Sequence, residues 1–145
     1  MKVFALKGRR NVGKSQTIRT VDELLRAKYP DARVEDEHRT GTELRVVMTI
    51  NGVKIGVESS TNVSFDFFLS RGCDVIICPS RTKGQTVNAV NALPGYEVVW
   101  LEQPSQFVPF EQVLSNLAMA RNIVEETEKS IAPAKPAVLS RAAGR

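Results

Sequence analysis

Residues 8–15 constrain this chain more than any other segment. They read Gly-Arg-Arg-Asn-Val-Gly-Lys-Ser and match the pattern G-x-x-x-x-G-K-[ST]. A short apolar run, Val-Phe-Ala-Leu, precedes the pattern, and apolar residues at helical spacing follow it. A strand, a glycine-punctuated loop and a helix in this order form the arrangement in which such a loop holds phosphate.

The residue types in this segment suit an anion. Glycine at positions 8 and 13 lets the backbone approach phosphate oxygens because no Cβ intervenes. Backbone N–H groups of the loop and of the next helix's first turn point at such an anion. Lys14 supplies a point charge for the β- and γ-phosphates, and the Ser15 hydroxyl suits Mg²⁺. The predicted triphosphate-binding residues are Gly8, Arg9, Arg10, Asn11, Val12, Gly13, Lys14, Ser15 and Gln16.

The rest of the chain alternates strand and helix patterns, which predicts an α/β fold for a domain over residues 1–131. Asn51-Gly52 predicts a tight hairpin, because both turn positions need positive φ. Residues 31–42 indicate a polar loop, and residues 132–145, rich in Ala, Pro and Lys, a disordered tail. Strands are predicted at 2–7, 43–50, 53–58, 74–79 and 96–101, and helices at 14–28, within 61–72, at 83–93 and at 110–128.

Composition narrows the class of protein. The 145 residues are 42% hydrophobic and 25% charged, which is ordinary for one globular domain. The sequence has neither an apolar run of about 18 residues nor a signal peptide, so we expect a cytoplasmic protein without a membrane segment. Three of the four net positive charges belong to residues 132–145, so the total does not support a nucleic-acid surface. Cys73 and Cys78 lie in or beside an apolar run and are expected to be buried.

The motif and the order of elements resemble the P-loop NTPase superfamily. The resemblance rests on residues 8–15 and loosely covers residues 2–105. The form G-x-x-N-V-G-K-S is similar to that of bacterial GTPases of the translation-factor class. The resemblance implies a three-layer fold whose sheet is mostly parallel with one antiparallel edge strand. It also implies that the second strand of the hairpin lies beside the P-loop strand.

The same resemblance implies two further ligands for Mg²⁺. A threonine before the hairpin would bind the metal, and Thr40 and Thr42 stand there, with Thr42 preferred. An acid would end the strand beside the P-loop, which indicates Glu58, with Glu102 as the reserve. The family usually has Asp at this place with a glycine two residues on, whereas this chain continues Ser59-Ser60-Thr61.

Base recognition departs from the GTPase pattern. No N-K-x-D segment follows either of the last two predicted strands, so ATP is favoured at least as much as GTP. Arg81 and Lys83 follow an apolar strand, where they could stabilise charge on a transferring phosphoryl group. The alternative is a solvated basic loop. His38 stands without a partner in a polar segment and is expected to be exposed.

These features predict a P-loop protein that binds a nucleoside triphosphate and hydrolyses it with Mg²⁺. Lys14, Arg81 and Glu58 are the candidate catalytic groups, and Ser15, Glu58 and Thr42 the candidate metal ligands. Two alternatives remain open. One is a nucleotide or small-molecule kinase, although no arginine-rich lid segment is evident. The other is a regulatory module that binds nucleotide without hydrolysis and contacts a protein partner.

Overall fold

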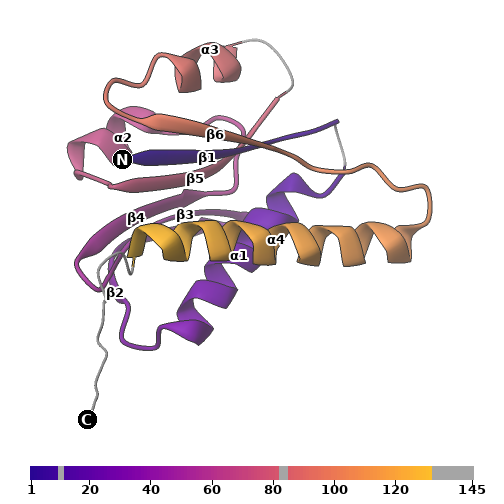
Figure 1. Cartoon of the computed structure of the whole chain (residues 1–145), viewed down its shortest axis with the longest axis horizontal. Helices are drawn as coiled ribbons and strands as arrows, with labels where there is room; N and C mark the ends of the chain where they lie inside the picture. The colour runs from indigo at the N-terminus through magenta and orange to yellow at the C-terminus, as the bar shows by residue number, and fades with distance from the viewer. Residues whose placement is uncertain (10–11, 82–84, 132–145) are drawn as a thin grey trace.

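The structure is a computed structural model, and it describes residues 1–9, 12–81 and 85–131. One six-stranded mixed sheet carries helices on both faces, in the order β2-β3-β4-β5-β1-β6 (Figure 1). The strands are β1 (Lys2–Lys7), β2 (Arg33–Thr40), β3 (Glu43–Ile50), β4 (Val53–Glu58), β5 (Val75–Ser80) and β6 (Glu97–Glu102). The helices are α1 (Lys14–Lys28), α2 (Phe65–Ser70), α3 (Gln85–Asn91) and α4 (Pro109–Ile131).

The core lies on both faces of the sheet. In β1, Phe4 and Leu6 belong to the cluster that α1 and α4 cover, whereas Val3 and Ala5 belong to the cluster beneath α2 and α3. This alternation follows from the period of two in a strand, and a strand buried on both faces is apolar throughout. The α/β class predicted from the sequence is therefore confirmed.

Most predicted elements are confirmed with small shifts at their ends. The hairpin turn has Asn51 at φ 51° and Gly52 at φ 82°, as a turn with two positive φ values requires. Cys73 and Cys78 are both buried, as expected. Residues 132–145, predicted to be disordered, lie outside the described residues.

The pairing of the strands differs from the prediction. The neighbours of β1 are β5 and β6, both parallel to it, so β4 lies one strand further away. The prediction that the second hairpin strand lies beside the P-loop strand was wrong. The expected antiparallel edge strand was also wrong, since the antiparallel strand is β3, which lies inside the sheet between β2 and β4.

The polar segment 31–42 is not a loop but contains edge strand β2. It pairs antiparallel with β3 and is exposed along almost its whole length. A strand with both faces exposed to solvent shows no alternation of apolar and polar residues, so the sequence pattern did not indicate a strand here. Its charges also protect the open edge against pairing with other chains. Four of them form ion pairs with the rest of the protein: Glu35 with Lys54, Asp36 with Arg71, Glu37 with Arg26 and Arg39 with Asp22.

Helix α4 has buried residues from Asn116 onward, whereas its first turns are largely exposed. Val113 is 62% exposed, because the first turns of α4 extend past the ends of the strands (Figure 1). Residues Phe107, Val108, Phe110 and Leu114 are exposed with it. Within the described residues, the structure has no helix that is both long and apolar enough to span a membrane.

Candidate functional site

Both glycines of the motif lie where a side chain would meet neighbouring atoms, severely at Gly13 and more mildly at Gly8. Gly13 has φ 85°, in the left-handed region, and a Cβ there would lie 2.2 Å from Asn116 Nδ2. A Cβ on Gly8 would lie 3.1 Å from Gln103 Cβ and 3.2 Å from Val12 Cγ2. The loop is therefore packed against β6 and α4 at its two ends. Two predicted ligands inside it, Arg10 and Asn11, lie outside the described residues.

The first turn of α1 has neither a cap nor an acid. Gly13 occupies the N-cap position, where no side chain caps the helix, and its carbonyl accepts hydrogen bonds from Thr17 N (2.9 Å) and Thr17 Oγ1 (2.8 Å). The first N–H groups of any α-helix lack an intrahelical acceptor, and here they include Lys14, Ser15 and Gln16. The positive end of the helix dipole thus faces the loop.

The Lys14 side chain joins the start of the loop to the end of β5. Its ammonium donates to Gly8 O at 2.7 Å and to Ser80 O at 3.0 Å, both neutral carbonyl oxygens. Burial lowers the pKa of Lys14, and the positive charge of Arg81 lowers it further. A bound anion would oppose both effects.

Arg81 adds exposed positive charge near this ammonium, and Arg9, in the loop itself, is also exposed. In the described part of the chain, none of the ion pairs involves Arg9, Lys14 or Arg81. Arg81, the predicted charge stabiliser, lies close enough to Lys14 for its charge to act on the ammonium. Lys83, its predicted companion, falls outside the described residues.

The structure brings Ser15 and Thr42 together. Arg19 Nη1 donates to Ser15 Oγ at 2.9 Å and to Thr42 O at 2.6 Å, and its Nη2 lies 3.4 Å from Gln16 Oε1. Two predicted metal ligands from distant segments therefore meet at one guanidinium. Thr40, the other candidate, instead places Oγ1 3.1 Å from Nε2 of the exposed His38.

Glu58 has different partners. Its carboxylate is 7% exposed and accepts a hydrogen bond of 2.8 Å from the backbone N–H of Ser64, just before α2. Burial raises its pKa, although the Ser64 amide and Arg45 act in the opposite direction. The structure brings Glu58 into contact with neither Lys14 nor Ser15, because β5 separates its strand from β1. Its observed contact is with the start of α2.

Metal ligation by carboxylates finds little support in the geometry. The described residues contain no group of three or more His, Cys, Asp or Glu side chains placed to hold a metal. Glu102, the reserve acid, lies level with Lys7 in the β1–β6 register and is exposed. Mg²⁺ commonly binds through few protein ligands together with phosphate oxygens and water. Ser15 fits that role.

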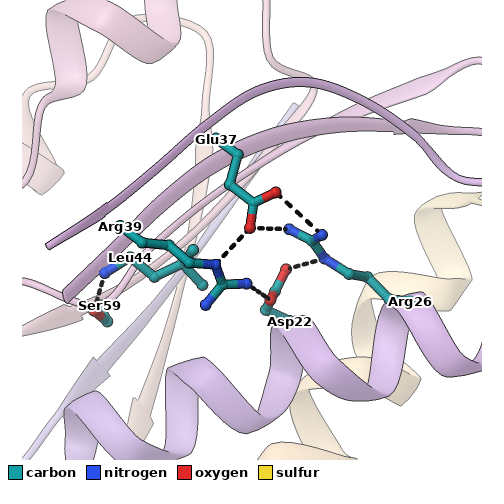
Figure 2. A network of polar contacts seen from close by, with 6 residues as sticks. All are labelled: Asp22, Arg26, Glu37, Arg39, Leu44 and Ser59. Carbon is teal, nitrogen blue, oxygen red and sulfur yellow. Dashed lines mark hydrogen bonds and ion pairs between the residues drawn. The ribbon is translucent and has the colours of Figure 1, made fainter. Parts of the chain in front are cut away.

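Behind the loop, four charged side chains fasten α1 to β2 (Figure 2). Asp22, 1% exposed, accepts from Arg26 Nε at 3.0 Å through Oδ1 and from Arg39 Nη2 at 3.3 Å through Oδ2. Glu37 accepts from Arg39 Nε at 2.6 Å and from Arg26 Nη1 at 3.3 Å. Each carboxylate thus contacts two arginines, and the network fixes the edge strand relative to the helix that carries Lys14 and Ser15.

Sequence reasoning missed three residues of this region. Gln103 and Asn116 are buried, their side-chain amides lie 2.8 Å apart, and they pack against the two motif glycines. No local pattern marks them, since their neighbours come from other segments. Arg19 did have a signal, because residues four apart on a helix face each other, and Ser15 lies four positions before it.

Comparison with known proteins finds no match to a family model, to a curated protein or to a solved structure. The functional interpretation of this chain therefore rests on its motif and on the geometry of the loop.

Proposed function

We propose that this protein binds a nucleoside triphosphate, with Mg²⁺, at residues 8–15 as a P-loop NTPase-like domain. One observation carries the proposal: among the described residues, the Lys14 ammonium, beside Arg81, contacts neutral carbonyl oxygens and no carboxylate, where a glycine-rich loop enters an uncapped helix. A triphosphate would supply the missing negative charge and accept hydrogen bonds from the free N–H groups.

The proposed residues have distinct roles. The N–H groups from Gly8 to Gln16 would bind phosphate oxygens, and Lys14 would contact the β- and γ-phosphates. Ser15 would ligate Mg²⁺ together with phosphate oxygens and water. Because neither β5 nor β6 is followed by an N-K-x-D segment, we favour ATP over GTP.

Hydrolysis is the proposed reaction, with Arg81 stabilising charge on the transferring phosphoryl group. Binding without turnover is the second candidate, and the position of Glu58 favours it. The described contacts of the Glu58 carboxylate lead to the Ser64 N–H and not to Lys14 or Ser15, so none of them orients it toward water at the loop. Phosphate release separates the two candidates, and release only with an added acceptor would indicate a kinase.

Calorimetric titration with ATP and with GTP, each with Mg²⁺ or with EDTA, tests the proposal. We expect saturable, Mg²⁺-enhanced binding of ATP to the full chain. The Lys14→Ala variant should lose this binding, whereas Lys28→Ala, which removes a lysine at the other end of α1, should retain it. Equal affinity in Lys14→Ala and the unmodified chain would refute the assignment of the loop.

A further inference from the structure

Arg19 contacts the Ser15 hydroxyl, the same oxygen that a Mg²⁺ ion bound to Ser15 would use. It lies one helical turn beyond Ser15, and its Nη1 contacts both Ser15 Oγ, at 2.9 Å, and Thr42 O, at 2.6 Å. Its Nη2 lies 3.4 Å from Gln16 Oε1. A positively charged group thus lies beside three oxygens, and all three belong to residues that the sequence predicted as metal ligands or as triphosphate-binding residues.

A guanidinium and Mg²⁺ cannot share the Ser15 hydroxyl at these distances. Mg²⁺ binds oxygen at about 2.0–2.1 Å and demands near-octahedral geometry around itself. With Arg19 Nη1 2.9 Å from the same oxygen, the two cations would lie within a few ångströms of each other. At that separation their repulsion is substantial even in a partly solvated site. Arg19 must therefore move before the metal can bind Ser15.

Movement of Arg19 also affects the turn between β2 and β3. Arg39 is fastened to Asp22 on one side of that turn, and on the other side Leu44 exchanges hydrogen bonds with Ser59 (Figure 2). Between these two anchors, the described contacts include one hydrogen bond from the turn to α1, which Arg19 donates to Thr42 O. Residues 40–42 are exposed, and Gly41, at φ 59°, has nothing within 4 Å of its Cβ position. The turn can therefore move while the rest of the hairpin stays in place.

We propose that Arg19 and Mg²⁺ compete for Ser15 Oγ, so that metal–nucleotide binding releases the turn at residues 40–42 from α1. The inference rests on the proposed function, since the metal would arrive with the nucleotide. It makes Arg19 a positioning residue, which holds Ser15 and Thr42 until the metal takes its place. The edge hairpin would then report the state of the nucleotide site.

Metal dependence of binding gives the first test, with ATP as the probe. We compare the dissociation constant with EDTA and with Mg²⁺ in the unmodified chain, in Arg19→Gln and in Arg33→Gln. Arg33 is an exposed arginine of β2, so its variant controls for the loss of one positive charge. Removing the competing hydrogen bond should strengthen the effect of Mg²⁺. The dissociation constant with EDTA divided by that with Mg²⁺ should therefore increase roughly three- to tenfold in Arg19→Gln alone. An unchanged or smaller ratio would overturn the proposal.

Hydrogen exchange of the amides at residues 40–43 gives a second, independent test. In the nucleotide-free protein, exchange should be several-fold faster in Arg19→Gln than in the unmodified chain or in Arg33→Gln. In the unmodified chain, ATP with Mg²⁺ should accelerate exchange at the same amides, whereas ATP with EDTA should not. Arg19→Lys, which retains the charge but cannot span both oxygens, should behave as an intermediate.

The two proposals fail in different ways. If ATP binds with Mg²⁺ but exchange at residues 40–43 does not respond, competition by Arg19 is wrong and nucleotide binding stands. If neither form of ATP binds the unmodified chain, both proposals are wrong, and the calorimetric trace alone reveals this.

Discussion

The first turn and the middle of α1 both carry charge but arrange it differently. In the middle, Asp22 contacts Arg26 and Arg39, and the same arginines contact Glu37, so each charge has opposite charge beside it. In the first turn, the Lys14 ammonium contacts two carbonyl oxygens, and the charge that acts on it is that of another cation, Arg81.

This difference separates two uses of charge in one helix. When one member of a network of paired charges is removed, the remaining charges lose their compensation and the fold loses stability, whereas charges that are already paired have little capacity left for a ligand. A half-buried cation without a carboxylate lowers the stability of the fold unless an anion joins it. We therefore expect the middle of α1 to determine stability and the first turn to determine binding.

Lys14→Ala should produce the largest effect and should confine it to binding. Two charge-assisted hydrogen bonds to phosphate would be lost, which corresponds to an affinity for ATP with Mg²⁺ lower by roughly a hundredfold or more. The free energy of unfolding should not fall, because burial and Arg81 both disfavour the Lys14 charge and no described residue offers it a carboxylate partner. Calorimetry and urea unfolding measure the two quantities. A large loss of stability would contradict the separation.

Asp22→Ala should show the opposite behaviour. It leaves Arg26 and Arg39 without their shared carboxylate, and since both arginines are partly exposed we expect a loss of about 2 kcal/mol in unfolding free energy. Affinity for ATP should change less than threefold, and we expect a change of about half a kcal/mol in binding free energy. Urea unfolding measures the first quantity, and Glu23→Ala, on the same helix, is the control. Loss of binding without loss of stability would place Asp22 in the ligand site instead.

Local sequence predicted the parts of the fold that depend on neighbouring residues. The loop at 8–15 and the turn at Asn51-Gly52 are both encoded within eight residues or fewer. The position of β5 beside β1 depends on contacts between distant segments. Gly56 illustrates such a contact, since a Cβ there would lie 2.4 Å from Phe68 Cδ1 as α2 packs on the sheet. No local pattern contains that information.

The candidate site was predictable to the same extent. Lys14 and Ser15 follow from the motif, whereas the contact of Lys14 with Ser80 O depends on which strand lies beside β1. Glu58 was predicted from a family plan that this sheet does not follow. Its contact with the residue before α2 depends on the face of the sheet that α2 covers, since Gly56 and Glu58 share one face of β4 and α2 packs on that glycine.

Glu37→Gln should have a smaller effect that depends on pH. Burial opposes the charge of Glu37, but hydrogen bonds from Arg39 and Arg26 outweigh it and hold its pKa below the ordinary value. An acid with a lowered pKa stabilises the fold above its unfolded pKa, and this stabilisation disappears as the pH falls through the folded value. The variant should therefore be less stable than the unmodified chain at pH 7 and nearly equal to it at pH 3. Equal differences at both pH values would contradict the ionic role.

Glu58→Gln should have the smallest effect, and its pH dependence should run the other way. Burial raises the pKa of Glu58, so the neutral form favours folding and that contribution disappears as the pH rises through the folded pKa. Glutamine keeps an oxygen for the Ser64 N–H but cannot ionise. The variant should match the unmodified chain at pH 4 and be slightly more stable at pH 7 in urea unfolding. Its Mg²⁺-dependent affinity for ATP should be unchanged, because the carboxylate contacts α2. A clear loss of Mg²⁺ dependence would instead return Glu58 to the metal site and show that the end of β4, like the first turn of α1, serves the ligand.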